Sequence, residues 1–290
     1  MNLIYHFFLQ NYARSKIRFM ESELGFQRMF VDLGGHKLFY LKRGGEGPEK
    51  KTLLLIHGLL DSASGFRKLA PYLRKDFTIL LPDIPGFGWS KLPNVRYLYQ
   101  VNIFADLLYE SIRELSLENV VLGGHSMGSL IAMHMALRDA QKEKRIKRLV
   151  LLAPGGIPHP KRDEMKDLLF PRNTQQIERL FASLYFESAP NLGGFAKRAL
   201  LSTWNGPANR YLTQNTLDRE EEIFLGKKLS AIGLKSLLVS GKEDPITDHR
   251  MVKKLHSYLK KSKIIWVPSA KHALHIERPF EVATAINDWL

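Results

Sequence analysis

Short apolar segments recur along this chain, and stretches long enough to form a helix separate most of them. The segments are rich in Leu, Val and Ile and lie at about residues 52–56, 77–81, 119–123, 148–152, 236–240 and 264–267. Apolar runs of this length are typical of strands buried on both faces, and intervening helices connect such strands in parallel. The pattern therefore predicts an α/β fold with a mostly parallel sheet and helices on both faces.

Two further extended segments precede this pattern. Residues 26–32 and 37–43 flank Gly34-Gly35, and a two-glycine turn between such segments favours a hairpin. We expect the hairpin to add an antiparallel edge to the sheet.

The alternation is interrupted once, between about residues 158 and 230. Apolar side chains there are spaced for one face of amphipathic helices, namely Leu168, Leu169, Ile177, Leu180, Phe181, Leu184, Tyr185 and Phe186. We expect most of them to pack this segment onto the core and a few to line an acyl pocket. The predicted organisation is an N-terminal apolar and basic segment (1–25), a core in two parts (26–157 and 231–290) and an inserted helical lid (158–230).

The pentapeptide Gly124-His125-Ser126-Met127-Gly128 directly follows the apolar run 119–123 and opens a helix-like stretch. A serine on such a tight strand-to-helix turn projects its hydroxyl away from the backbone. Glycine is needed on both sides because a Cβ atom there would collide with the neighbouring helix and strand. Ser126 is therefore a candidate nucleophile, with a glycine-flanked turn of no catalytic role as the alternative.

A serine hydroxyl reacts only if a base takes its proton, and a carboxylate must orient that base. Asp244 follows the apolar segment 236–240, and His272 follows the segment 264–267, so both are predicted on loops at strand ends. Ser126, Asp244 and His272 form the candidate catalytic triad. Two alternatives stay open, which are His275 as the base and Asp248 as the acid.

An anion-stabilising pocket is predicted where the buried strand at residues 51–56 ends in His57-Gly58. Glycine lets the backbone turn so that the next amide points at the substrate. The expected donors of this oxyanion hole are the backbone N–H groups of Leu59 and Met127, the second reinforced by the dipole of the following helix. His57 is expected to support the loop, whereas His125 occupies the permissive position of the pentapeptide.

Together these motifs resemble the α/β-hydrolase fold superfamily, and the order Ser, acid, His is the one that this superfamily uses. The matching segments are His57-Gly58, 83–90 (DIPGFGWS), 124–128 (GHSMG), 241–244 (GKED) and 272–279 (HALHIERP). Two positions depart from the family's pattern, because Ser129 and Lys271 stand where glycine is usual. The segment 153–157 (APGGI) and the apolar N-terminal extension are similar to those of monoacylglycerol lipases and related bacterial lipases. Carbon–carbon bond hydrolases of aromatic ring cleavage share much of the same pattern.

The resemblance implies a serine hydrolase that cleaves carboxylic esters of small lipids or other hydrophobic acyl compounds through an acyl-enzyme. Ser126 argues against related dehalogenases and epoxide hydrolases, which need a carboxylate nucleophile at this position. The alternatives are a carbon–carbon bond hydrolase and a ligand receptor without turnover. We expect no cofactor and no metal ion, because the histidines lack metal-ligand spacing and no phosphate-binding glycine loop is present. The chain has no cysteine, which excludes disulfides and thiol chemistry.

The chain carries a formal net charge of +14, yet no nucleic-acid module accompanies it. We expect no nucleic-acid partner, and we interpret most of the charge as a solvated surface. An anionic membrane surface is the second candidate.

Near the N-terminus, apolar residues (Leu3, Ile4, Phe7, Phe8) precede basic ones (Arg14, Lys16, Arg18). The apolar run is too short to span a bilayer and lacks the features of a secretory signal. It fits a helix in the membrane interface or, equally well, one packed on its own protein. We expect a cytoplasmic protein with the option of peripheral membrane contact, and the sequence predicts no oligomeric state.

Overall fold

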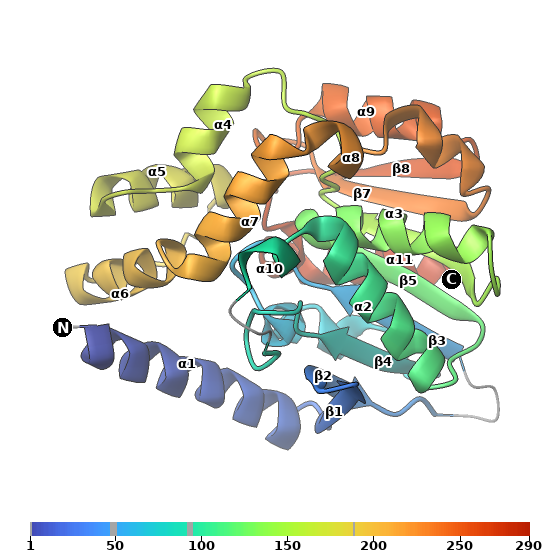
Figure 1. Cartoon of the computed structure of the whole chain (residues 1–290), viewed down its shortest axis with the longest axis horizontal. Helices are drawn as coiled ribbons and strands as arrows, with labels where there is room; N and C mark the ends of the chain where they lie inside the picture. Colours follow the sequence, from blue (N-terminus) through green and yellow to red (C-terminus); the bar gives the residue numbers. More distant parts are fainter. Residues whose placement is uncertain (1, 47–50, 92–94, 188) are drawn as a thin grey trace.

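The computed structural model describes residues 2–46, 51–91, 95–187 and 189–290, and these form one sheet surrounded by helices (Figure 1). The eight-stranded sheet has the order β1-β2-β4-β3-β5-β6-β7-β8. Its strands are β1 (Gln27–Leu33), β2 (His36–Arg43), β3 (Lys51–Ile56), β4 (Phe77–Pro82), β5 (Val120–His125), β6 (Ile146–Leu152), β7 (Lys235–Gly241) and β8 (Ser262–Val267). All neighbours from β4 to β8 pair in parallel. The predicted α/β fold with a mostly parallel sheet is confirmed.

The antiparallel edge is a hairpin of β1 and β2. Leu33 pairs with His36, so Gly34 and Gly35 alone form the turn, and their φ angles of 62° and 95° lie in the region that favours glycine. β2 then pairs antiparallel with β4. The hairpin predicted around the two glycines is therefore present at the expected edge.

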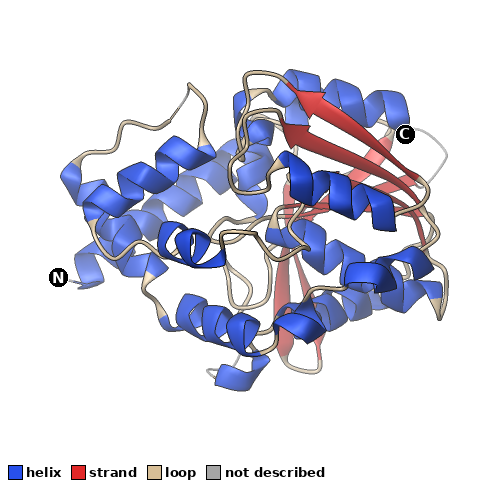
Figure 2. Ribbon diagram, turned by 90° about the horizontal axis from the view of Figure 1, so that it is seen from above, coloured by secondary structure: helices blue, strands red, loops and turns tan. Residues whose placement is uncertain are grey.

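Helices cover both faces of the sheet (Figure 2). Side chains alternate along the buried strands, so that Leu54 and Ile56 of β3 enter one apolar cluster while Leu53 and Leu55 enter the other. The first cluster lies under α2 (Val101–Glu114), α3 (Met127–Ala140) and α9 (His249–Tyr258). The second lies under α1 (Asn2–Ser22), η1 (Ala63–Arg67), η2 (Ala70–Tyr72) and α11 (Pro279–Trp289). The short helices η3 (Arg96–Leu98), η4 (Gly226–Ala231) and α10 (Leu274–Glu277) lie in connections.

Between β6 and β7, the described residues form five α-helices ahead of η4. They are α4 (Arg162–Leu169), α5 (Thr174–Leu184), α6 (Gly194–Trp204), α7 (Pro207–Asp218) and α8 (Glu220–Ile223). Of the apolar face predicted for this segment, Ile177 and Leu180 are fully buried, whereas Phe186 is exposed. Figure 1 shows α4, α5 and α6 beside the sheet rather than within its two helical layers.

The N-terminal helix α1 joins these inserted helices to the core. Its residues Ile17 and Met20 are buried against the sheet, and its residue Tyr5 stacks edge-on against Phe195 of α6 at 5.1 Å between ring centroids. None of the helices in the described part of the chain combines the length and apolar character that crossing a bilayer requires.

Candidate active site

Ser126 occupies the turn between β5 and α3. Its φ of 53° and ψ of −115° lie in a region that side chains with a Cβ rarely adopt, and its N–H donates to the Leu152 carbonyl at 2.9 Å. A Cβ atom at Gly124 would lie 2.4 Å from the Gly128 carbonyl carbon, and one at Gly128 would lie 2.1 Å from the Ile56 carbonyl oxygen. Both flanking glycines are therefore required by close backbone packing, as the sequence predicts, and this packing holds the serine in its strained conformation.

Asp244 and His272 meet at the ends of β7 and β8. The His272 Nδ1 lies 2.9 Å from Asp244 Oδ2, and both side chains are buried. Asp244 also accepts bonds from the Thr247 hydroxyl (2.6 Å) and from the N–H groups of Ile246 (2.8 Å) and Thr247 (3.1 Å). Burial alone would raise the pKa of the Asp244 carboxyl. The attraction of a protonated His272 and these hydrogen bonds outweigh burial, so the pKa of Asp244 lies below its ordinary value.

The ionised Asp244 fixes which nitrogen of His272 carries the proton. Because the carboxylate can only accept, Nδ1 of His272 is the donor in this pair, and Nε2 keeps the lone pair of a base. No hydrogen bond joins Nε2 to the Ser126 hydroxyl among the described residues, although such bonds are often loose before substrate binds. A hydrogen bond nonetheless connects the segment of Ser126 with the loop of His272, because Nε2 of His125 lies 2.8 Å from the His272 carbonyl oxygen and donates to it.

The loop after β3 presents a free amide to the same region. The Ile84 N–H donates to Nε2 of His57 at 2.9 Å, so Nδ1 of His57 carries the proton and donates to the Gly58 carbonyl at 2.7 Å. In a trans peptide the following N–H points the opposite way, so this bond sets the direction of the Leu59 N–H. Within the described part of the chain, neither Leu59 N–H nor Met127 N–H donates to another protein group. Both residues line one pocket with Ser126.

Neither of the two alternatives takes part in the Asp244–His272 pair. Asp248 caps α9 by accepting bonds from the N–H groups of Arg250 and Met251, and its carboxylate pairs with the Arg250 guanidinium at 2.6 Å. His275 is buried between Phe66 and His125, and neither of its ring nitrogens has a partner among the described residues. Burial lowers the pKa of His275 to about 4; His272 and Arg67 act in the same direction, whereas Asp61 opposes them.

The pocket that contains Ser126 is lined mainly by apolar side chains and has a volume of about 240 Å³. The core contributes Leu130 and Met251, and the inserted helices contribute Met165, Leu169 and Leu212. Polar groups lie mostly on the inserted side. Among the described residues, no group of three or more His, Cys, Asp or Glu side chains is arranged to hold a metal ion.

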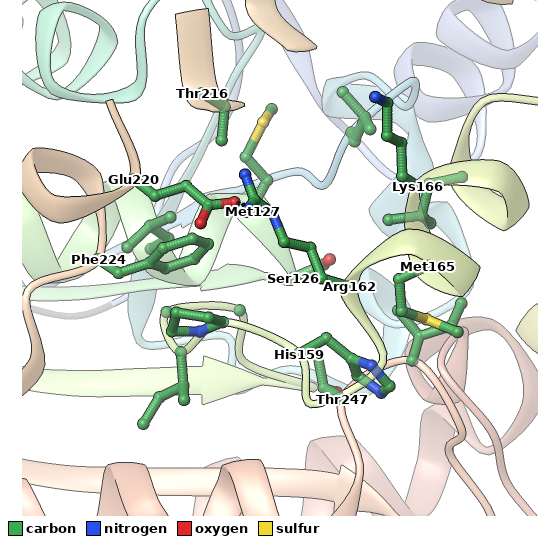
Figure 3. A pocket seen from close by; sticks show the side chains of 18 of the residues that line it. Ser126, Met127, His159, Arg162, Met165, Lys166, Thr216, Glu220, Phe224 and Thr247 are labelled. Carbon is green, nitrogen blue, oxygen red and sulfur yellow. Dashed lines mark ion pairs between the residues drawn. The ribbon is translucent and has the colours of Figure 1, made fainter. Parts of the chain in front are cut away.

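An ion pair crosses this pocket between the first and last inserted helices. Arg162 of α4 and Glu220 of α8 reach toward one another in the close-up, with Nε of the arginine 2.8 Å from Oε1 of the glutamate (Figure 3). Their side chains are 52% and 23% exposed. Lys166, one turn further along α4, makes no ion pair with any described residue. The entrance is therefore polar, whereas the interior is apolar.

Sequence reasoning missed several of these residues. Thr247 follows Asp244 by three positions, and at this spacing in a turn a hydroxyl can donate a hydrogen bond to the carboxylate. A local signal for Thr247 therefore existed. His125, interpreted as a permissive position, instead binds the backbone of His272. Arg162 and Glu220 are far apart in the chain, and no local pattern connects them.

Comparisons with known proteins agree with the fold. Residues 51–279 match the model of the family described as the alpha/beta hydrolase fold. An uncharacterized hydrolase of Bacillus subtilis strain 168, YugF, is 27% identical over 294 residues, 93% of this chain and 100% of its own. The 2-hydroxymuconate semialdehyde hydrolase of Pseudomonas sp. strain CF600 is 25% identical over 258 residues, 82% of this chain and 86% of its own. Among solved structures, a membrane phospholipase A, a bacterial virulence factor, superposes with a TM-score of 0.82 at 24% identity, covering 97% of this chain and 91% of that one.

Proposed function

The chain belongs to the alpha/beta hydrolase fold family, and we propose that it is a serine hydrolase that cleaves carboxylic esters of small lipids or other hydrophobic acyl compounds. One observation carries the proposal. Ser126 and two unpaired N–H groups, those of Leu59 and Met127, border the same apolar pocket, while a hydrogen-bonded Asp244–His272 pair lies on the adjacent loops. A strained nucleophile beside free amide donors is what acyl transfer requires.

In the proposed mechanism, Nε2 of His272 takes the proton of the Ser126 hydroxyl, and the oxygen attacks the ester carbonyl. The N–H groups of Leu59 and Met127 hold the resulting oxyanion, and Asp244 stabilises the protonated imidazole. His272 then gives its proton to the departing alcohol. Water hydrolyses the acyl-enzyme in a second step with His272 again as the base.

The pocket supports a substrate with one hydrophobic acyl chain. Its apolar interior suits hydrocarbon, and the charged residues Arg162, Lys166 and Glu220 suit a polar group outside. We assign residues 158–230 as a lid between the two parts of the core, 26–157 and 231–290, because its helices provide much of the pocket wall. The similarity to a membrane phospholipase A fits this class of substrate.

A carbon–carbon bond hydrolase is the second candidate, because one relative is a 2-hydroxymuconate semialdehyde hydrolase. Such substrates are small and acidic, whereas most of the residues around this pocket are apolar. A panel of 4-nitrophenyl esters assayed beside a ring-cleavage dienoate separates the two. Faster turnover of the dienoate than of every ester would favour the carbon–carbon reaction.

A fluorophosphonate probe tests the shared mechanism. It should label the wild-type protein and leave Ser126→Ala unlabelled, because only an activated serine reacts. Ser129→Ala is the matched control, since Ser129 lies in the same turn but donates its hydroxyl to the Gly124 carbonyl. An unlabelled wild-type protein would instead support a ligand receptor without turnover.

A further inference from the structure

One face of α1 is apolar and open to solvent. Ile4, Phe8, Tyr12 and Phe19 follow one another along this face at spacings close to whole helical turns, and their exposed fractions range from 39% to 63%. Ile17 and Met20 of the same helix are buried, and Tyr5 and Phe8 contact Phe195 of α6. An exposed apolar stripe on a helix that already packs on its own protein calls for a second partner.

The stripe leads into a groove between α1 and the connections that follow β3. Phe19 belongs to both, and Lys16, Arg67, Lys68 and Tyr72 also line the groove, which has a volume of about 530 Å³. Tyr72 is 48% exposed and stacks edge-on against Phe280 of α11. The groove is thus an aromatic surface with three cations.

The three cations are not neutralised by the protein. No Asp or Glu lines the groove, and Lys16, Arg67 and Lys68 make no ion pair within the described residues. Lys16 instead lies over the Tyr12 ring, with its Nζ 4.5 Å from the ring centroid. Arg67 differs in this from many other arginines, which pair with carboxylates, as Arg28 does with Glu21 and Arg74 with Asp76.

We propose that this face of α1 and the groove dock the protein on an anionic lipid bilayer. Aromatic and aliphatic side chains suit the boundary between headgroups and acyl chains, and unpaired cations suit the phosphates of the headgroups. The net charge of +14 attracts the whole molecule to such a surface. A second copy of the chain carries the same three cations, so the groove would repel itself. Nucleic acid would match the charge but not the aliphatic residue Ile4 at the end of the stripe.

Vesicle co-sedimentation tests the proposal. The full-length protein should sediment with vesicles of phosphatidylcholine and phosphatidylglycerol and stay in solution with phosphatidylcholine alone. The groove variant, Lys16→Glu with Arg67→Glu and Lys68→Glu, should bind the anionic vesicles at least about tenfold more weakly. Its hydrolysis of a soluble ester should be unchanged, which shows that it is folded.

A matched control separates the groove from net charge. Lys253→Glu with Lys260→Glu and Lys261→Glu removes the same charge from exposed positions on α9 and the turn after it, at the other end of the molecule (Figure 1). This variant should keep most of the binding. Equal losses in the two triple variants would overturn the proposal, because net charge would then suffice.

The apolar stripe has its own variant, Ile4→Ser with Phe19→Ser, which leaves every charge and the Phe8–Phe195 contact in place. This variant should also bind the anionic vesicles more weakly. Salt should fully reverse its remaining binding, because only the charges still hold it to the vesicles. Sedimentation velocity without lipid gives the remaining outcome. A dimer that the Ile4 and Phe19 changes dissociate would mean that the stripe holds a second copy, and the membrane proposal would be wrong.

Discussion

The loops after β5 and β7 and the inserted helices α4, α7 and α8 line the same pocket, but they are built differently. Buried hydrogen bonds cross-link the loops, from His272 to Asp244 and from His125 to the His272 carbonyl. The inserted helices meet across the pocket through Arg162 and Glu220, and much of that ion pair is solvent-exposed. The difference suggests that one region fixes the chemistry while the other selects the substrate and can change without loss of the chemistry.

The largest expected effect lies in the cross-linked loops. Ser126→Ala should lower kcat on an activated ester by roughly four to six orders of magnitude, because no other group can form the acyl-enzyme. His272→Ala should match it, and Asp244→Ala should be milder. Urea unfolding checks that the variants stay folded, and Asp248→Ala is the control on the same loop. Comparable losses of kcat from Asp248→Ala and Asp244→Ala would mean that Asp244 is not the only carboxylate that supports His272. The hydrogen bonds of Asp244 would then not identify the catalytic acid.

A second effect concerns the stability of the same region. Because the pKa of His275 is lowered to about 4, its ring stays neutral in the folded protein while the unfolded chain takes up a proton as pH falls below about 6.5. Stability should therefore drop between pH 7 and pH 5, by about 2 kcal/mol from this residue. In urea unfolding, the free energy of unfolding of His275→Leu should fall by about 2 kcal/mol less than that of the wild-type protein between pH 7 and pH 5. His6→Gln, at an exposed position of α1, is the control and should retain the wild-type dependence.

The inserted helices should control chain-length preference. Each methylene buried in the pocket should raise kcat/KM by about fourfold, equivalent to about 0.8 kcal/mol, until the pocket is full. Leu169→Ala should weaken this preference because Leu169 lines the pocket. Leu168→Ala is the control and should not weaken it, because Leu168 does not line the pocket. A series of 4-nitrophenyl esters from acetate to decanoate measures both. A flat profile in the wild-type protein would remove the acyl-binding role from α4.

The smallest effect should come from the ion pair across the pocket. A partly exposed pair contributes less than about 1 kcal/mol, so Arg162→Gln, Glu220→Gln and the double variant should differ from one another by only a few-fold in kcat/KM. High salt should reduce the coupling between them further. A coupling above about 2 kcal/mol in this double-mutant cycle would place α4 and α8 among the rigid parts of the site.

The two regions also differ in what the sequence could predict. The strands, the hairpin and the inserted helical segment follow from local patterns of apolar residues and glycines. The fold class was therefore predictable. The positions of Ser126, Asp244 and His272 at strand ends follow from the same patterns, because parallel strands bring their carboxyl ends to one edge. Their catalytic roles stay predictions.

Contacts between distant segments were beyond sequence reasoning. The Arg162–Glu220 pair depends on how five short helices fold back on one another, and no periodicity encodes that path. His125 had a local position but no local partner, since the His272 carbonyl lies 147 positions later, on the loop after β8. The groove at Lys16 likewise required the placement of α1 beside η1.

The left-handed backbone of Ser126 has a thermodynamic consequence for the whole molecule. A residue with a Cβ in this conformation costs on the order of 1–3 kcal/mol, and the packing of α3 against β3 and β5 supplies that energy. Glycine at this position would relax the strain, so Ser126→Gly should melt at a higher temperature than the wild-type protein although it cannot form an acyl-enzyme. On the proposed mechanism, the chain gives up part of its folding stability to keep the Ser126 hydroxyl ready for attack.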